Sequence, residues 1–348
     1  MRAAVIKEWG KPLSIEDVPK PEPGPGEVLV RIHASGVCHT DIHQWKGDWS
    51  SVKYIMEKHG VRILGHEGIG VVEEVGLGVS RLRKGDRVGV PWMNSWCGAC
   101  ESCLSGYPHW CPHAVNTSVH VNGTHAEYAI IHEKAAPKIP KEIGDVEAAP
   151  LMCAGVTAYG AIRKLVTEAR IPPGKPIAII GAAGGLGHYA VQIAKAFGYV
   201  VLGVDVGEDR VKFVEKIGAD YAIDAKSAEK FAKEKFGGVY ASVVFTPKIA
   251  GYELGLMMLR PLGALVSVGL PDVKEGVIPL YPLTVVGMGI RVFGSVVGVT
   301  HEFEELFNLV VAGKVKSHIT MIADLSEINT IFKELEEGKI VGRAVLKI

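Results

Sequence analysis

Hydrophobic residues in the first 150 positions occur in short runs that glycine and proline interrupt. Residues 27–32 follow the turn-forming sequence Pro23-Gly24-Pro25-Gly26 and are predicted to form a strand, as are residues 70–75 and 86–90. Many short strands separated by turns are typical of a barrel-like β domain. We therefore expect the first part of the chain to be rich in β-structure.

The pattern changes near residue 155, where apolar runs begin to alternate with helical periodicity. The uninterrupted apolar run at 177–180 is typical of a strand that is buried on both faces. Alternating strands and helices predict a parallel sheet with helices on both faces. The expected strands are 177–180, 200–204, 221–223, 241–245 and 264–268, and the expected helices include 186–197 and 209–217.

A third pattern begins after about residue 292. Two amphipathic helices are predicted at about 301–312 and 325–337, and Asp324 with Glu327 fits a capping pair for the second. Residues 344–348 are expected to be a closing strand.

A glycine-rich turn lies between the predicted strand 177–180 and the helix that follows. Its sequence is Gly181-Ala182-Ala183-Gly184-Gly185-Leu186-Gly187, and Asp205 ends the next strand. Glycines without Cβ atoms allow a pyrophosphate to approach a helix N-terminus, and the acid would bind the adenosine ribose. A carboxylate there would repel a 2′-phosphate, which favours NAD over NADP. The alternative is a turn that serves only strand–helix packing.

Composition and charge exclude several classes of protein. The 348 residues contain 38 Lys+Arg and 38 Asp+Glu, and this balance argues against a nucleic-acid binder. The sequence predicts no membrane span and no signal peptide, so we expect a cytoplasmic protein with reduced thiols. Only five Asn and two Gln occur, a depletion that suggests a heat-adapted source.

Six cysteines therefore need an explanation other than disulfides. Four of them lie close together in the sequence: Cys97, Cys100, Cys103 and Cys111. Four thiolates suit a closed, tetrahedral, structural zinc site. An iron–sulfur cluster and unligated thiols are the alternatives.

The other two cysteines, Cys38 and Cys153, combine with His66 into a second possible metal site. Two thiolates and one imidazole form a ligand set that catalytic zinc uses, with the fourth position left for water or substrate. Taken singly, Cys153 is better explained as a small buried apolar residue and His66 as a buried, hydrogen-bonded histidine.

Several motifs together resemble those of zinc-containing alcohol dehydrogenases of the medium-chain dehydrogenase/reductase superfamily, most closely the yeast and microbial tetrameric branch. They are Cys38-His39-Thr40-Asp41-Ile42-His43, Gly65-His66-Glu67-Gly68, the four-cysteine loop, Cys153-Ala154-Gly155-Val156-Thr157, the glycine turn and Ile340-Val341-Gly342-Arg343. The resemblance implies an α/β protein. Its catalytic domain would be GroES-like and of β-barrel type, would comprise residues 1–154 and 292–348, and would carry a structural zinc lobe at about 95–112. Its cofactor domain would be a Rossmann domain with a doubly wound parallel sheet at residues 155–291.

The resemblance also implies an activity: oxidation of primary or secondary alcohols to aldehydes or ketones. Hydride would pass from a zinc-bound alkoxide to the nicotinamide of NAD. Each chain would hold one catalytic and one structural zinc ion. The resemblance further implies a homotetramer that acts on small molecules, without nucleic acid or membrane.

Residue roles follow from the same resemblance. Cys38, His66 and Cys153 match the catalytic zinc ligands, and Glu67 matches an acid that can become a transient ligand. Asp41 matches the carboxylate that orients the imidazole. Thr40 matches the hydroxyl that binds the alcohol, and His43 the outer end of a proton relay through the cofactor ribose. The positions that match cofactor contacts are His39, Thr157, Gly184, Gly185, Leu186, Gly187, Asp205, Arg210, Gly269, Leu270, Ser295 and Arg343.

The substrate and rival functions are less constrained. Trp92 matches a pocket-narrowing aromatic residue, and Trp45 and Trp49 follow the catalytic motif. Bulky indole side chains there would suit small primary alcohols. Residues 50–62, however, form a long stretch that could reshape the cleft. A polyol or threonine dehydrogenase of the same superfamily is the first alternative. A zinc-ribbon nucleic-acid-binding protein is the remote one, because ribbons usually pair two C-x-x-C motifs over a longer spacer.

Overall fold

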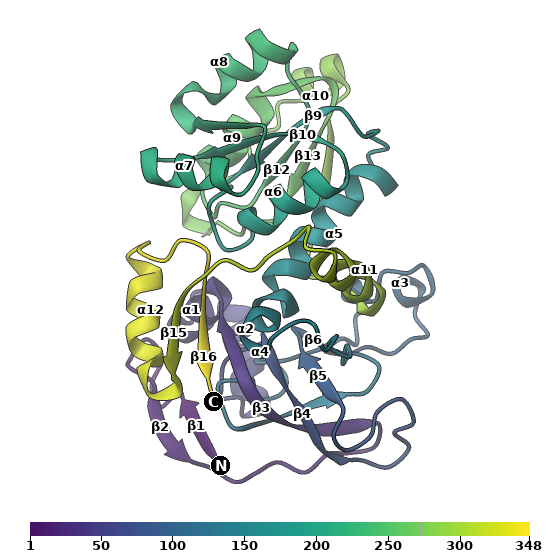
Figure 1. Ribbon diagram of the computed structural model, residues 1–348, viewed down its shortest axis with the longest axis vertical. Helices are drawn as coiled ribbons and strands as arrows, with labels where there is room; N and C mark the ends of the chain where they lie inside the picture. The colour runs from purple at the N-terminus through teal and green to yellow at the C-terminus, as the bar shows by residue number, and fades with distance from the viewer. Residues whose placement is uncertain (272) are drawn as a thin grey trace. The chain divides into compact units, whose positions relative to one another are not determined.

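The computed structural model describes residues 1–271 and 273–348, and it divides the chain into two compact units (Figure 1). Unit 1 comprises Met1–Val156, Val297–Val311 and Ser317–Ile348. Unit 2 comprises Thr157–Val296 and Ala312–Lys316. The chain thus returns to unit 1 about five residues later than the sequence analysis expected.

Unit 1 is built around a mixed sheet in the order β15-β16-β3-β4-β5, with β8 also paired to β3. The strand β3 is long and pairs with β4, β8 and β16, and the β-branched residues Val28, Val30 and Ile32 recur along it at the period of a strand. The strand bounds are β3 (Glu27–Val37), β4 (Gly68–Val75), β5 (Arg87–Val90), β8 (Tyr128–His132), β15 (Ile319–Asp324) and β16 (Arg343–Lys347). Two small sheets add β1 (Arg2–Val5) with β2 (Ser14–Asp17) and β6 (Met93–Ser95) with β7 (Val115–Asn116).

Short helices connect these strands. They are α1 (His39–Lys46), α2 (Ser50–His59), α3 (Glu101–Leu104), η1 (Pro108–Trp110), α4 (Asp145–Ala148), η2 (Ala149–Met152), α11 (Thr300–Val311), η4 (Leu325–Glu327) and α12 (Ile328–Glu336). The predicted capping pair is confirmed, since Asp324 and Glu327 form a capping box at η4. The long stretch 50–62 contains α2, whose Met56 lies in a hydrophobic core with residues of α1 and α12.

Unit 2 contains a six-stranded parallel sheet in the order β11-β10-β9-β12-β13-β14. This order reverses on either side of β9, as in a doubly wound dinucleotide-binding fold. The strands are β9 (Pro176–Ile180), β10 (Val200–Asp205), β11 (Tyr221–Asp224), β12 (Val239–Val244), β13 (Leu259–Ser267) and β14 (Arg291–Gly294). All five strands expected in this region are present, each with bounds shifted by a few residues.

Helices pack against this sheet (Figure 1). They are α6 (Gly187–Ala196), α7 (Glu208–Lys216), α8 (Ala225–Phe236), α9 (Ile249–Met257) and α10 (Pro282–Met288); η3 (Val273–Glu275) is a short turn, and α5 (Ala154–Thr167) leads into the unit. The buried strand β9 is apolar on both faces, as its uninterrupted run of hydrophobic residues predicted. Among the described residues, every helix is too short or too polar to cross a membrane.

Candidate active site

Four metal-ligating side chains meet in the interior of unit 1. Ligand atoms of Cys38, His66, Glu67 and Cys153 all lie within 4.8 Å of one another, and each side chain is at most 8% exposed. They come from the start of α1, from the turn before β4 and from the end of η2. The structure therefore brings together the three ligands that sequence spacing alone could not pair.

Local structure at the start of α1 positions Cys38 together with Asp41. Cys38 is the N-cap, with extended backbone, and Asp41 stands at the third helical position. The Asp41 carboxylate accepts a hydrogen bond of 2.8 Å from the Cys38 backbone N–H, which forms half of a capping box. Helix capping and the placement of a candidate ligand are thus achieved by the same residues.

Asp41 also holds the segment that carries His66. Its Oδ1 accepts a hydrogen bond of 3.1 Å from the Gly65 backbone N–H and lies 3.1 Å from His66 Nδ1. Burial alone would raise the pKa of Asp41, but the neighbouring His66 and His125 outweigh it and hold this pKa well below its usual range. The lowered pKa favours the charged carboxylate, which can orient the imidazole.

Glu67 is paired with a residue from the far end of the chain. Arg343 donates to both of its carboxylate oxygens, and the two residues are 276 positions apart. Burial raises the pKa of Glu67 to about 7, and the Arg343 guanidinium opposes that rise. Gly36 leaves the space for this carboxylate, because a Cβ there would lie 2.0 Å from Glu67 Oε2.

Arg343 was expected to contact the cofactor pyrophosphate. The structure instead shows it 4% exposed and paired with Glu67, a partner that the sequence did not indicate. The expected pyrophosphate contact therefore stays a prediction.

The groups expected to serve the alcohol and its proton lie on or beside α1. Thr40 is partly exposed in the first turn, and His43 follows one turn later. His43 Nδ1 lies 2.8 Å from Asp48 Oδ2, and its ring stacks on Trp49 with centroids 4.7 Å apart. Since a carboxylate only accepts, Nδ1 carries the proton and Nε2 is the acceptor.

Trp92 is the aromatic residue that packs directly against the metal-ligating group. Its ring meets the His66 ring edge-on, with centroids 5.0 Å apart. Trp45 instead packs against Phe332 of α12 and donates to the Lys11 carbonyl. Of the three tryptophans considered for the substrate pocket, Trp92 thus lies beside His66, whereas Trp45 belongs to the core.

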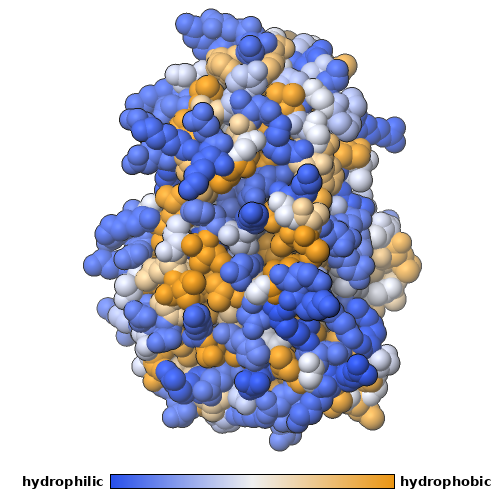
Figure 2. Space-filling model, viewed as in Figure 1, coloured by the Kyte–Doolittle hydropathy of each residue, from blue (hydrophilic) through white to orange (hydrophobic). Residues whose placement is uncertain are grey.

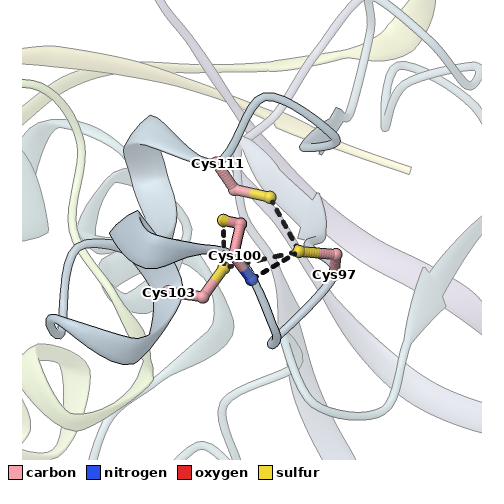
Figure 3. A group of neighbouring side chains, drawn as sticks. All are labelled: Cys97, Cys100, Cys103 and Cys111. Atoms are coloured by element: carbon pink, nitrogen blue, oxygen red, sulfur yellow. Dashed lines mark hydrogen bonds between the residues drawn. The ribbon is translucent and has the colours of Figure 1, made fainter.

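The four-cysteine loop forms a second cluster (Figure 3). Its Sγ atoms lie within 4.8 Å of one another, with separations of 3.5 Å for Cys100–Cys103 and for Cys97–Cys111. Backbone N–H groups of Ala99 and Cys100 lower the pKa of the Cys97 thiol to about 6, which favours the thiolate that binds metal. All six cysteines are free thiols.

Both clusters fit zinc on their own chemistry. Among the described residues, neither ring nitrogen of the buried His66 makes a hydrogen bond of good geometry; Nδ1 faces Asp41 Oδ1 at 3.1 Å, and a metal would supply the partner that Nε2 lacks. Two thiols and an imidazole match an open catalytic set, and four thiols match a closed structural set.

The glycine turn of unit 2 lies between β9 and α6, where the sequence predicts it. A Cβ on Gly187 would lie 2.0 Å from the Gly181 carbonyl oxygen, so the close approach of turn and helix start requires glycine there. Asp205 ends β10, and its carboxylate accepts hydrogen bonds from the Ala183 and Val206 N–H groups, at 2.7 and 2.8 Å. The turn and the expected ribose acid are therefore directly linked.

The other expected cofactor contacts are distributed over both units. Arg210 Nη1 lies 3.7 Å from Asp205 Oδ1, whereas Leu270 is 60% exposed beyond β13. Thr157 and Ser295 are buried, and Gly269 closely approaches the Thr246 carbonyl. His39 is exposed at the start of α1, and Gly184, Gly185 and Leu186 lie in the turn itself.

Sequence reasoning missed several polar residues of the site. They are Asp48 beside His43 and a buried group of Ser35, Thr124 and His125 next to Asp41; Glu67 and Arg343 were both expected in the site, but their pairing was not. Asp48 lies five residues from His43, beyond the Gly47 C-cap of α1, so its nearness in the sequence was the only local signal. The others depend on strand pairing between distant segments and left no local signal.

Comparison with known proteins agrees with this site. The alcohol dehydrogenase GroES-like domain matches residues 24–141 and the zinc-binding dehydrogenase domain matches residues 185–312. Alcohol dehydrogenases of Geobacillus stearothermophilus and Rhizobium meliloti (strain 1021) are 44% and 41% identical, and the alignments cover 100% of this chain and 100% and 99% of theirs.

Solved structures show the same likeness. An alcohol dehydrogenase from the hyperthermophilic archaeon Aeropyrum pernix is similar with a TM-score of 0.88 and 35% identity, and both chains are fully covered. A cobalt- and zinc-bound thermostable alcohol dehydrogenase from Pyrobaculum aerophilum has a TM-score of 0.88 and 28% identity, over 100% of this chain and 99% of that one. With its two thiol clusters and its parallel-sheet unit, the chain belongs to the zinc-containing alcohol dehydrogenase family of the medium-chain dehydrogenases.

Proposed function

We propose that this protein oxidises primary or secondary alcohols to aldehydes or ketones, reversibly, with NAD and a catalytic zinc ion. The observation that carries the proposal is the buried group of Cys38, His66 and Cys153, whose ligand atoms lie within 4.8 Å of one another beside Glu67. Unit 1 would be the catalytic domain and unit 2 the cofactor domain.

Zinc held by Cys38, His66 and Cys153 would act as a Lewis acid that lowers the pKa of an alcohol hydroxyl. Asp41 would fix the orientation of the imidazole, and Arg343 holds the Glu67 carboxyl group in place and opposes the rise in its pKa. Trp92, whose ring meets His66 edge-on, would limit the width of a substrate site beside the ligands. These contacts support a small alcohol as substrate.

Proton removal is assigned to Thr40 and His43. The Thr40 hydroxyl would bind the alcohol, and His43 would hold the proton on Nε2 before it passes to solvent. The Asp48 carboxylate supports this role because it fixes the Nδ1–H tautomer of His43.

The preference for NAD is assigned to Asp205. Its carboxylate lies at the end of β10 and is anchored by the glycine turn, where it would bind ribose hydroxyls and repel a 2′-phosphate. Nicotinamide would supply the hydride acceptor, while the chain supplies orientation and charge.

A single preparation tests these proposals together. Elemental analysis should give two zinc ions per chain, and the same enzyme should reduce NAD with ethanol and larger alcohols. One zinc or none in fully active enzyme would contradict the division of the cysteines into two sites. Oxidation of sorbitol or threonine in preference to every simple alcohol would select the polyol or threonine alternative.

We further propose a homotetramer in the cytoplasm. Support for association is the exposed apolar surface of α10, where Leu283 and Val286 are 86% and 81% exposed, and the open edge strand β14 next to it in sequence. Support for a reducing compartment is that all six cysteines are free thiols in clusters suited to metal.

A further inference from the structure

Behind Asp41 lies a buried polar group that the proposed mechanism does not use. Ser35, Thr124 and His125 are fully buried. Ser35 Oγ lies 2.7 Å from Thr124 Oγ1 and 3.0 Å from His125 Nδ1. The other ring nitrogen, His125 Nε2, lies 3.6 Å from Asp41 Oδ2.

The backbone places this group against the turn that carries His66. The Thr124 N–H donates to the Gly65 carbonyl at 3.0 Å, and the His125 N–H donates to the Leu64 carbonyl at 2.9 Å. Gly65 has a φ of +94°, and a Cβ there would lie 2.6 Å from His125 Nδ1. Glycine at 65 is therefore what allows the His125 ring to lie next to this turn.

The direction of the hydrogen bonds follows from the carboxylate. Asp41 can only accept, so His125 Nε2 must carry a proton where it faces Oδ2. In the neutral ring Nδ1 is then the acceptor, and the Ser35 hydroxyl donates to it. The Thr124 hydroxyl in turn donates to Ser35 Oγ. Thr124, Ser35 and His125 thus form one directed chain, and its end, His125 Nε2, has no hydrogen-bond partner among the described residues and faces Asp41 Oδ2 at 3.6 Å.

The same carboxylate faces His66 from its other oxygen. Asp41 Oδ1 lies 3.1 Å from His66 Nδ1, and Oδ2 faces His125 Nε2. Backbone N–H groups of Cys38 and Gly65 occupy the remaining directions, at 2.8 and 3.1 Å. Rotation of the carboxylate about its Cβ–Cγ bond would move the partner of His66, and His125 lies where it opposes that rotation.

We propose that His125, supported by Ser35 and Thr124, is a positioning residue that locks Asp41 and through it the ring orientation of the ligand His66. The inference rests on the proposed function, because it concerns the ligand set assigned to the catalytic metal. A buried chain of this kind has no use in packing alone, since apolar side chains of similar size would fill the space without the cost of burying four polar groups.

The test compares His125→Leu with His125→Gln in the zinc-loaded enzyme. Leucine keeps the approximate side-chain size without a donor, whereas glutamine returns an N–H donor near the Nε2 position. Zinc release to excess dipicolinate, followed with a chromogenic dye, measures how firmly the ligands are held. The absorption spectrum of the cobalt-substituted protein reports the ligand geometry independently of turnover.

We expect His125→Leu to release the catalytic zinc about tenfold faster than wild type and to alter the cobalt spectrum, as loss of an outer hydrogen-bond partner of a ligand does. His125→Gln should restore both readouts most of the way. The rate constant kcat should fall more than KM changes, because the alcohol does not touch His125.

Ser35→Ala and Ser118→Ala form a matched pair that needs no change at position 125. Both hydroxyls are fully buried, but Ser118 donates to Gln44 and does not belong to the Asp41 chain. Ser35→Ala should accelerate zinc release, and Ser118→Ala should not. Equal release rates in these two variants, or a wild-type rate and spectrum in folded His125→Leu, would overturn the inference.

The outcome is separable from the proposed function. Wild-type enzyme without zinc or without alcohol oxidation would refute the function. Wild-type enzyme with both, together with unaffected zinc release in the variants, would refute only the role of His125.

Discussion

At the scale of single residues, the site is defined by side chains that each contact two partners. Asp41 caps α1 through the Cys38 N–H and faces His66, and Asp205 binds the glycine turn while facing Arg210. Each carboxylate accepts hydrogen bonds from backbone N–H groups, which restrict its direction before any ligand binds. Substitutions at this scale should change chemistry more than folding.

His43→Gln should lower alcohol oxidation by roughly ten- to a hundredfold near neutral pH, within the usual range for loss of a proton-transfer group. The loss should shrink at higher pH, where hydroxide can take the proton. The measurement is the pH–rate profile, with zinc content as a check on the metal. His59→Gln, at the exposed end of α2, is the control. A wild-type profile in His43→Gln would leave His43 without a role in the reaction.

Asp205→Gly should shift the ratio of kcat/KM for NAD over NADP towards NADP by about tenfold or more, because a like-charge repulsion is removed. Asp209→Ala, an exposed carboxylate at the start of α7, is the matched control and should leave the ratio unchanged. Wild-type enzyme that used NADP as well as NAD would show that the carboxylate does not select the cofactor.

At the scale of secondary-structure elements, short helices and turns hold the side chains that are expected to bind metal. The cysteine loop at 97–111 contains only α3 and η1 and buries little apolar surface, so a metal would supply much of its folding energy. Cys153 follows directly on α4 and η2, which are joined to the sheet through Asp145. The cysteine loop and the segment α4–η2 can therefore each be tested by substitutions that leave the metal ligands of the other cluster unchanged.

Cys103→Ser should lower the thermal unfolding temperature, on the order of 10 °C, because a structural metal contributes folding free energy. Cys38→Ser should instead abolish turnover with little change in unfolding temperature, since the open site supplies the chemistry. Calorimetry and activity assays on the two variants distinguish a structural from a catalytic role of each cysteine. Equal loss of activity with unchanged unfolding in both would refute the division into structural and catalytic sites.

Asp145→Asn should weaken the attachment of α4 by about 1 kcal/mol, because its carboxylate accepts from Arg87 and pairs with His33. Burial by itself would raise the pKa of Asp145, but His33 and Arg87 lower it by more than burial raises it. The pKa of Asp145 in the folded state therefore lies below its pKa in the unfolded state.

The stabilisation by Asp145 should therefore be complete above pH of about 4 and disappear as the pH falls through the lower, folded-state pKa. The measurement is the difference in free energy of unfolding between wild type and Asp145→Asn across pH 2 to 7. A difference that stayed constant below pH of about 3 would contradict the assignment.

At the scale of the whole molecule, apolar surface remains uncovered in both units. Hydrophobic side chains reach the surface among hydrophilic ones on the face drawn in Figure 2, and Ile322 of β15 is 51% exposed. Scattered residues of this kind are ordinary. In unit 2, however, α10 carries exposed apolar residues close in sequence to β14, which has an open edge.

Val286→Glu should reduce the assembled mass, because a charge would be buried in the contact that we assign to α10. Size-exclusion chromatography with light scattering measures the mass directly. Leu77→Glu provides a matched control on an 82% exposed leucine of unit 1 and should leave the mass unchanged. A monomeric wild type, or an unchanged mass in Val286→Glu, would contradict the proposed assembly.

The sequence by itself determined what depends on neighbours along the chain. The alternation of apolar strands and periodic helices predicted the parallel sheet of unit 2, and the spacing of Cys97 to Cys111 predicted a cluster of thiols. The pair Asp324 and Glu327 predicted a helix start. These features are local because backbone hydrogen bonding and side-chain periodicity act within a few residues.

Only the tertiary structure decided which distant residues meet. The chain has 13 histidines, and periodicity does not show that His66 joins Cys38 and Cys153 or that His125 faces Asp41. The family resemblance supplied the first of these groupings, whereas nothing in the sequence indicated the second or the pairing of Arg343 with Glu67. Such contacts are set by strand register and sheet order, which depend on the packing of the whole unit and leave no trace in local sequence.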